Sequence, residues 1–279
     1  MRLLFLQGSP RNPEGEAHQA GKTRALLAHA VAEAERLGAE VDVLDLSVSE
    51  EGARVQPCYG CISTAGGYHC HYPCDCYRTD DPDAPPDFLA QARAFDRVQA
   101  ADALLTYCPV NWYSVPTQVK AAFDRFVCAS LTLTRRDAVR LLGRDRLKDA
   151  QATRAACKAH LADDLLTNHW AGKVAGFFVH GDDGADDYAE REKPRSLQLY
   201  PDVSSPVNDP RAAVLPLVQQ MRYSGVNVPG DLIVSAVFNR GTDYATANDV
   251  IRHNHRALDL AAELVRRTMA LLDAGRSRT

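Results

Sequence analysis

The sequence lacks a long apolar run and an excess of positive charge. The opening apolar run, residues 3–6, is too short for a signal peptide or a membrane span. Lys and Arg total 32 against 36 Asp and Glu, a net charge of −4, so no overall positive charge attracts nucleic acid or an anionic membrane. We therefore expect a cytoplasmic protein with no membrane and no nucleic-acid partner.

Several common functional motifs are missing as well. A P-loop has four residues between its glycines, but five separate Gly15 from Gly21. The dinucleotide fingerprint Gly-x-Gly-x-x-Gly is absent because position 10 is proline. No catalytic triad and no paired-carboxylate motif is found, which fits chemistry that a bound cofactor performs.

The composition is that of an ordinary globular protein, and the chain alternates between strand and helix patterns. Of 279 residues, 46% are hydrophobic and 24% are charged. Apolar runs predict strands at 2–7, 41–46, 103–108, 173–179 and 232–237, and helical spacing predicts helices at 23–37, from Pro116 onward, and at about 246–272. Such alternation indicates an α/β fold, a doubly wound five-stranded parallel sheet with helices on both faces. No linker is evident, so we expect a single domain over 1–279, with helical and loop insertions at about 129–171 and 185–215.

In such folds ligands bind beyond the carboxyl ends of the strands. The first strand ends at Gly8-Ser9-Pro10-Arg11, and Gly21-Lys22-Thr23 begins the following helix. Hydroxyls, backbone N–H groups and a positive helix end are what a phosphate needs, although a polar surface loop with a threonine cap explains the same residues.

The loop after the third strand is bounded by prolines and contains two aromatic residues. It reads Pro109-Val110-Asn111-Trp112-Tyr113-Ser114-Val115-Pro116. A flat, polarisable ring needs an aromatic or apolar wall and backbone polar groups at its edge, and this loop supplies both. The alternative is that Trp112 and Tyr113 are core aromatics that cap the sheet.

The loop after the fourth strand, His180-Gly181-Asp182, is polar and contains glycine. His180 is a weak candidate for a catalytic proton donor, and a plain turn explains the loop nearly as well.

Five of the eight cysteines fall within one window of a loop at 57–81, namely Cys58, Cys61, Cys70, Cys74 and Cys76. A secreted disulfide framework normally belongs to a much smaller chain. Crowded thiolates in a reducing compartment instead favour a metal, a cluster or redox chemistry. Cys108, Cys128 and Cys157 are scattered through apolar contexts and are expected in the core.

The loops after the first and third strands resemble those of the flavodoxin-like NAD(P)H-dependent FMN reductases. The resemblance implies that Ser9, Arg11 and Thr23, with Lys22 as an addition, hold the FMN phosphate. It also implies that residues 109–114 surround the flavin ring, in a loop followed by a helix that carries Lys120 and Asp124-Arg125, and that His180, Gly181 and Asp182 lie on the other side of the ring.

The cysteine window resembles that of the iron–sulfur branch of this family, whose four cysteines hold a [4Fe–4S] cluster near FMN. Cys58, Cys61 and Cys76 match the pattern ahead of Asp80-Asp81, but Thr64 stands at the third cysteine position. Cys70 or Cys74 would have to replace it. Zinc, with His69 or His71 as substitutes, and no metal at all are the alternatives.

The resemblance implies an FMN-dependent oxidoreductase that passes electrons from NAD(P)H to a quinone, a flavin or another small acceptor, in part through a [4Fe–4S] cluster. A non-enzymatic FMN electron carrier and a zinc-stabilised binding module are the alternatives. We also expect a homodimer or homotetramer, since the apolar stripe of the last helix suits a dimer seam as well as a core. A basic stretch at 135–148 is either a solvated helix face or a contact for the second phosphate of NADPH.

Overall fold

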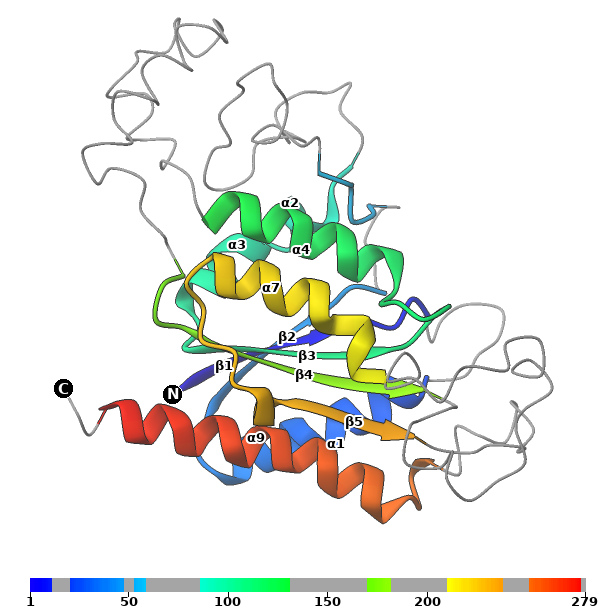
Figure 1. Cartoon of the computed structure of the whole chain (residues 1–279), viewed down its shortest axis with the longest axis vertical. Coiled ribbons are helices and arrows are strands. Elements are labelled where there is room, and N and C mark those ends of the chain that lie inside the picture. The colour runs from blue at the N-terminus through cyan, green and yellow to red at the C-terminus, as the bar shows by residue number, and fades with distance from the viewer. Residues whose placement is uncertain are drawn as a thin grey trace, which may run out of the picture.

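The protein is represented by a computed structural model that describes residues 1–11, 21–47, 53–58, 86–130, 170–181, 210–237 and 251–276. A parallel sheet of five strands forms its centre (Figure 1). The strands are β1 (Arg2–Gln7), β2 (Glu40–Asp45), β3 (Ala103–Pro109), β4 (Val174–Gly181) and β5 (Ile233–Val237). Their order is β2-β1-β3-β4-β5, and every pairing is parallel. This order confirms the predicted flavodoxin-like doubly wound fold.

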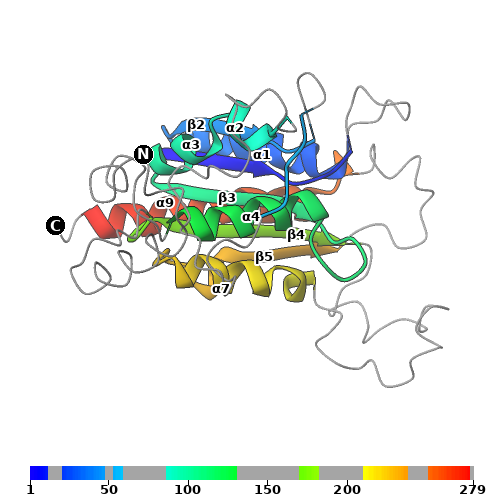
Figure 2. The ribbon, with the colours of Figure 1, turned by 90° about the horizontal axis from the view of Figure 1, so that it is seen from above.

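Helices cover both faces of the sheet, as Figure 2 shows from above. Helices α1 (Lys22–Arg36) and α9 (His255–Arg276) pack on one face. The other face is covered by α2 (Phe88–Gln91), α3 (Ala94–Ala100), α4 (Thr117–Ser130) and α7 (Leu215–Tyr223). Two short 3-10 helices, η6 (Pro210–Val214) and η7 (Gly230–Leu232), lie on the connection between β4 and β5.

The central strands β1, β3 and β4 are mostly apolar because both faces of a doubly wound sheet are buried, whereas the edge strand β2 alternates apolar and acidic residues and is mostly only partly buried. Along β1, Leu3 and Phe5 pack toward α1 and α9, whereas Leu4 and Leu6 pack toward the opposite helices, and all four are fully buried. Burying one such side chain contributes about 1.5–3 kcal/mol. The two cores therefore hold the strand ends, and the loops that follow them, in fixed positions.

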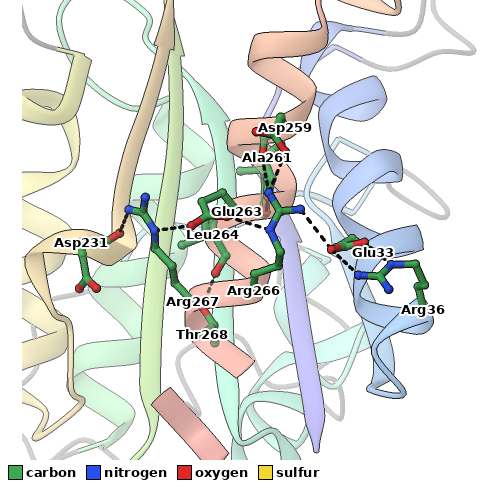
Figure 3. A network of polar contacts seen from close by, with 11 residues as sticks. Glu33, Arg36, Asp231, Asp259, Ala261, Glu263, Leu264, Arg266, Arg267 and Thr268 are labelled. Carbon is green, nitrogen blue, oxygen red and sulfur yellow. Dashed lines mark hydrogen bonds and ion pairs between the residues drawn. The ribbon is translucent and has the colours of Figure 1, made fainter. Parts of the chain in front are cut away.

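Helices α1 and α9 are also joined by an ion-pair network centred on Arg266 (Figure 3). Its guanidinium reaches Glu33 of α1 at 3.1 Å, and Glu263 and Asp259 of α9 at 2.8 and 2.7 Å. Hydrogen bonds from Arg36 and then from Arg266 lower the pKa of Glu33 to about 2, although burial opposes them. The network is partly exposed, so packing of the two helices contributes more to their association than these ion pairs do.

The last helix differs from its prediction. It was expected to begin near residue 246, but α9 begins at His255, where Asn254 accepts a hydrogen bond from the Ala257 N–H at 3.1 Å. Asparagine at this position ends the preceding turn and begins a new helix. Ile251 is buried but precedes α9, while Val265 and Met269 of the predicted stripe belong to the core between α9 and the sheet, and Ala262 is buried as well.

Most of the two predicted insertions, namely residues 131–169 of the first and 185–209 of the second, lies outside the described residues, and the single-domain organisation stays a prediction. Within the described ranges, no helix combines the length and the apolar character that crossing a membrane requires.

Candidate functional site

A cleft of about 400 Å³ opens at the carboxyl ends of β1, β3 and β4. Its volume is within the range of cofactor and small-molecule sites, about 300–1,000 Å³. It lies where the strand order reverses, between β1 and β3, which is where ligands bind in such sheets. The lining residues are Ser9, Pro10, Arg11, Gly21, Lys22, Thr23, Pro109, Val110, Asn111, His180 and Gly181.

The loop after β1 is held in place by the buried side chain of Gln7. Its amide oxygen accepts a hydrogen bond from the Ser9 N–H, and its amide nitrogen donates to Asp45 Oδ1 at 3.1 Å. Asp45 ends β2 and forms an ion pair with Arg24 of α1 at 2.6 Å. The first turn of the loop is therefore fixed to the neighbouring strand and to the start of α1.

Gly8 permits the close approach of this loop to β3 and α4. Its N–H donates to the Tyr107 carbonyl at 2.8 Å. A Cβ atom at position 8 would lie 2.6 Å from Val119 Cγ2 and 2.8 Å from Cys108 Cβ, closer than real contacts allow. Glycine is required here because of space, not because of its backbone angles.

The start of α1 has the properties of an anion site. Gly21 is the N-cap and supplies no side-chain hydrogen bond to the first turn. The N-terminal N–H groups and the helix dipole favour a negative charge there. The cations Arg11 and Lys22 line the same part of the cleft, and the Ser9 hydroxyl accepts a hydrogen bond from the Arg11 N–H at 3.3 Å.

The loop after β3 begins as a two-residue hairpin turn. Asn111 and Ser114 exchange backbone hydrogen bonds of 2.8 and 3.1 Å, and the central residues Trp112 and Tyr113 have φ of 49° and 64°. Two positive φ angles are typical of a type I′ turn and are unfavourable for large side chains. Trp112 is 95% exposed and Tyr113 64%, so neither is a core residue that caps the sheet.

His180 connects the end of β4 to the start of α1. Its Nε2 lies 2.7 Å from Thr23 Oγ1, and both side chains are buried at the wall of the cleft. Burial, and then the charge of Lys22, lowers the pKa of His180 from 6.5 to about 3. The imidazole is therefore neutral at physiological pH, which favours a hydrogen-bonding role over that of a proton donor.

A buried ion pair joins α4 to the N-cap of α2 and was not predicted from the sequence. The guanidinium of Arg125 in α4 forms a bidentate ion pair with the carboxylate of Asp87, with N–O distances of 2.5 and 2.8 Å. Neither residue is more than 2% exposed. Asp87 also accepts a hydrogen bond from the Ala90 N–H at 3.1 Å and so caps α2. The available signal was an aspartate directly before the apolar pair Phe88-Leu89.

The structure brings together most of the residues predicted to bind the cofactor. Ser9, Arg11, Lys22, Thr23, Pro109, Val110, Asn111, His180 and Gly181 all line the cleft. Trp112, Tyr113 and Ser114 follow in the exposed turn, outside the lining. Asp182 lies outside the described residues. The roles of these residues stay predictions.

The predicted metal ligands fall largely outside the described part of the chain. Cys58 is partly buried, whereas Cys61, Cys70, Cys74 and Cys76 are not described. Within the described ranges, no group of three or more His, Cys, Asp or Glu side chains is arranged to hold a metal ion. Of the scattered cysteines, Cys108 is confirmed as a core residue, and burial raises its pKa to about 12.

The fold and the cleft define a flavodoxin-like α/β protein whose cleft lies at the carboxyl ends of β1, β3 and β4, beside the start of α1. The family model described as NADPH-dependent FMN reductase matches residues 1–144, slightly more than half of the chain. The chain belongs to this family, which confirms the predicted class of FMN- and NADPH-using oxidoreductases. Membership of the iron–sulfur branch stays a prediction.

Comparison with curated proteins gives no match. Solved structures similar to this chain include the NAD(P)H:quinone oxidoreductase from Methanothermobacter marburgensis, at 14% identity and TM-score 0.47, covering 95% of this chain and 98% of that one. An FMN-dependent NADH-azoreductase from Bacillus anthracis, solved with FMN, has 10% identity and TM-score 0.46, covering 96% and 99%. At these scores the likenesses add nothing to the family assignment.

Proposed function

We propose that this chain is an FMN-dependent oxidoreductase that takes electrons from NAD(P)H and passes them to a quinone, a flavin or another small acceptor. The proposal rests on one observation: the anion-binding start of α1 and the Pro109–Asn111 segment line the same cleft. A phosphate-bearing planar cofactor needs both features within reach of one another. Membership of the FMN reductase family supports the same cofactor.

The residues present fit FMN. The phosphate would be held by Arg11, Lys22 and the N–H groups at the start of α1. The two side chains supply positive charge, and the N-cap Gly21 has no side chain that would accept hydrogen bonds from these N–H groups. A Cβ at Gly21 would lie in van der Waals contact with Ser9 Oγ, at 3.4 Å, and would occupy part of the space between Ser9 and the start of α1. The cleft volume of about 400 Å³ suits a single small-molecule cofactor.

When bound, FMN supplies the two-electron chemistry between NAD(P)H and the acceptor. The chain's contribution is to position the ring, and the backbone beside the cleft is rigid. The Val110 N–H donates to the His180 carbonyl at 2.8 Å, which joins the loop after β3 to the end of β4. The polar edge of a ring placed there would meet the backbone of Val110 and Asn111, and the exposed Trp112 and Tyr113 would extend over it.

Titration of cofactor-free protein with FMN tests the proposal. We expect saturable binding of one FMN per chain, and oxidation of NAD(P)H when a quinone is added. Replacing Lys22 by alanine should weaken FMN binding, because it removes a cation at the phosphate end. Arg93→Ala, which changes an exposed cation paired with Asp96 at 2.9 Å, is the matched control.

Two outcomes would favour an alternative function, and a third would contradict the proposed phosphate site. Flavin-loaded protein that oxidises no NAD(P)H would favour a non-enzymatic electron carrier. Protein that binds no flavin but contains zinc would favour a binding module. Equal losses of FMN affinity in the Lys22 and Arg93 variants would contradict the placement of the phosphate.

The further predictions concern partners and metals, and they are parts of the same proposal. We expect a homodimer or homotetramer, as the sequence indicated. A [4Fe–4S] cluster or a zinc ion at Cys58, Cys61, Cys70, Cys74 and Cys76 stays a prediction.

A further inference from the structure

The side chain of His180 is buried at the cleft, and the proposed function assigns it no role in proton transfer. A neutral imidazole with a pKa near 3 cannot store a proton at pH 7, yet its Nε2 makes a 2.7 Å contact with Thr23 Oγ1. The two residues are 157 positions apart in the sequence and come from different elements, α1 and β4. The contact therefore joins the end of β4 to the first turn of α1, where the anion site lies.

One proton lies between these two atoms, and its position decides what Thr23 offers to the cleft. If Thr23 donates to His180 Nε2, its hydroxyl presents only lone pairs to an anion, and the two repel. If His180 donates from Nε2, the threonine hydroxyl proton is free to point at the anion. A neutral histidine can supply that N–H in one of its two tautomers.

We propose that His180 is a positioning residue that donates from Nε2 to Thr23 and thereby turns the Thr23 hydroxyl into a donor for the cofactor phosphate. The inference rests on the proposed binding of FMN in this cleft. It makes His180 a determinant of specificity for the phosphorylated flavin over the same flavin without its phosphate. Burial and the neighbouring Lys22 keep the imidazole neutral, so the pair adds a directed donor and no further charge.

Two substitutions of His180 separate this role from simple packing. Glutamine can place an amide N–H where Nε2 now lies, whereas asparagine is too short to reach Thr23. Dissociation constants for FMN and for riboflavin should be measured on both variants, because riboflavin has the same ring and no phosphate. Thermal unfolding of each variant checks that it is folded.

A hydrogen bond to a charged group corresponds to a factor of roughly ten or more in affinity. We expect His180→Asn to bind FMN about tenfold more weakly than the wild type while its affinity for riboflavin changes less than about twofold. His180→Gln should retain most of the discrimination. Thr23→Val should show the same loss as His180→Asn, and the double variant should lose no more than Thr23→Val alone.

Nitrogen NMR of labelled protein gives a second measurement that does not depend on activity. In the FMN complex, His180 Nε2 should have the chemical shift of a protonated ring nitrogen. An unprotonated Nε2 in the complex would overturn the inference. So would equal losses for FMN and riboflavin in His180→Asn, since these indicate a general structural role.

Failure of the underlying function gives a different result. Wild-type protein that binds no FMN would overturn the proposed function and this inference together. Wild-type protein that binds FMN well, with a discrimination that His180→Asn leaves intact, would overturn the inference alone.

Discussion

Gly8 occupies the position beside the cleft where the fold leaves least room. Replacing it by alanine would push a methyl group against Val119 Cγ2 and Cys108 Cβ, at 2.6 and 2.8 Å. Overpacking of this kind costs about 1–3 kcal/mol in the free energy of unfolding. The same displacement should weaken FMN binding, because Gly8 precedes Ser9.

Urea denaturation of Gly8→Ala measures this cost. Gly275→Ala is the matched control, since the residue is within α9 and, in the described part of the chain, an added Cβ meets nothing within 4 Å beyond the adjacent helix backbone. We expect the control to be neutral or slightly stabilising, as alanine is favoured over glycine in helices. A stability for Gly8→Ala equal to that of the control would refute the steric argument.

The neutral state of His180 predicts a dependence of stability on pH. Its pKa is about 3 in the folded protein and 6.5 in the unfolded chain, so the unfolded chain binds the extra proton between these values. The contribution of the neutral His180 to the free energy of unfolding is therefore fully present above pH 6.5. It decreases as the pH falls toward 3, by up to about 1.4 kcal/mol per pH unit.

Urea denaturation at pH 7, 6 and 5 tests this dependence on the wild type and on His180→Gln. The wild type should lose more stability than the variant over this range, in which Glu33, whose pKa is about 2, stays ionised. Parallel losses in the two proteins would show that His180 does not titrate in this way.

At the scale of elements, the Asp87–Arg125 pair joins α2 to α4, the helix that follows the Trp112–Tyr113 turn. Arg125 also lies 5.6 Å from the ring centroid of Phe95 in α3. Removing one partner of a buried pair leaves an uncompensated charge and costs about 3–5 kcal/mol. Asp87→Asn and Arg125→Met should each show a loss of this size in chemical denaturation.

The double variant Asp87→Asn/Arg125→Met removes both charges and should recover part of the lost stability. Asparagine keeps a capping oxygen for α2, so the loss in Asp87→Asn reports the charge and not the cap. A double variant as unstable as the sum of the singles would mean that the two side chains act independently.

The elements of the sheet were predictable because β1, β3, β4 and β5 are short apolar runs, and β2 alternates apolar and acidic residues as an edge strand does. The helices α2, α3 and α7 were not predicted. The first two are short, and α7 follows a segment rich in Pro and Asp. The start of α9 was misplaced because the apolar spacing continues through Ile251, while the Asn254 cap sets the boundary.

The candidate site was predictable as far as the strand ends locate it. Loops after β1, β3 and β4 were expected to converge, and their residues do line one cleft. The pairing of Thr23 with His180 was not predictable, because it depends on the register between distant elements. The backbone of Trp112 and Tyr113 was not predictable either, since large aromatic residues rarely occupy a turn with positive φ.

At the scale of the whole molecule, the cysteine window determines how many electron carriers the protein holds. If the predicted [4Fe–4S] cluster is present, protein purified without air should contain about four iron and four sulfide per chain beside its flavin. Its visible spectrum should then combine both chromophores. Chelation of the iron should remove the cluster signal, and flavin-containing protein with neither iron nor sulfide would refute the cluster.

The described residues that precede and follow residues 59–85 are hydrogen-bonded to one another. Arg54 and Asp87 form a parallel bridge, the Phe88 N–H donates to the Arg54 carbonyl at 2.9 Å, and Gln56 donates to the Pro86 carbonyl at 3.0 Å. The entropic cost of closing a connection between two such fixed ends grows slowly with its length, by only about 0.6 kcal/mol for each doubling. This part of the gene could therefore lengthen, shorten or be exchanged between relatives while the flavodoxin-like scaffold stays unchanged.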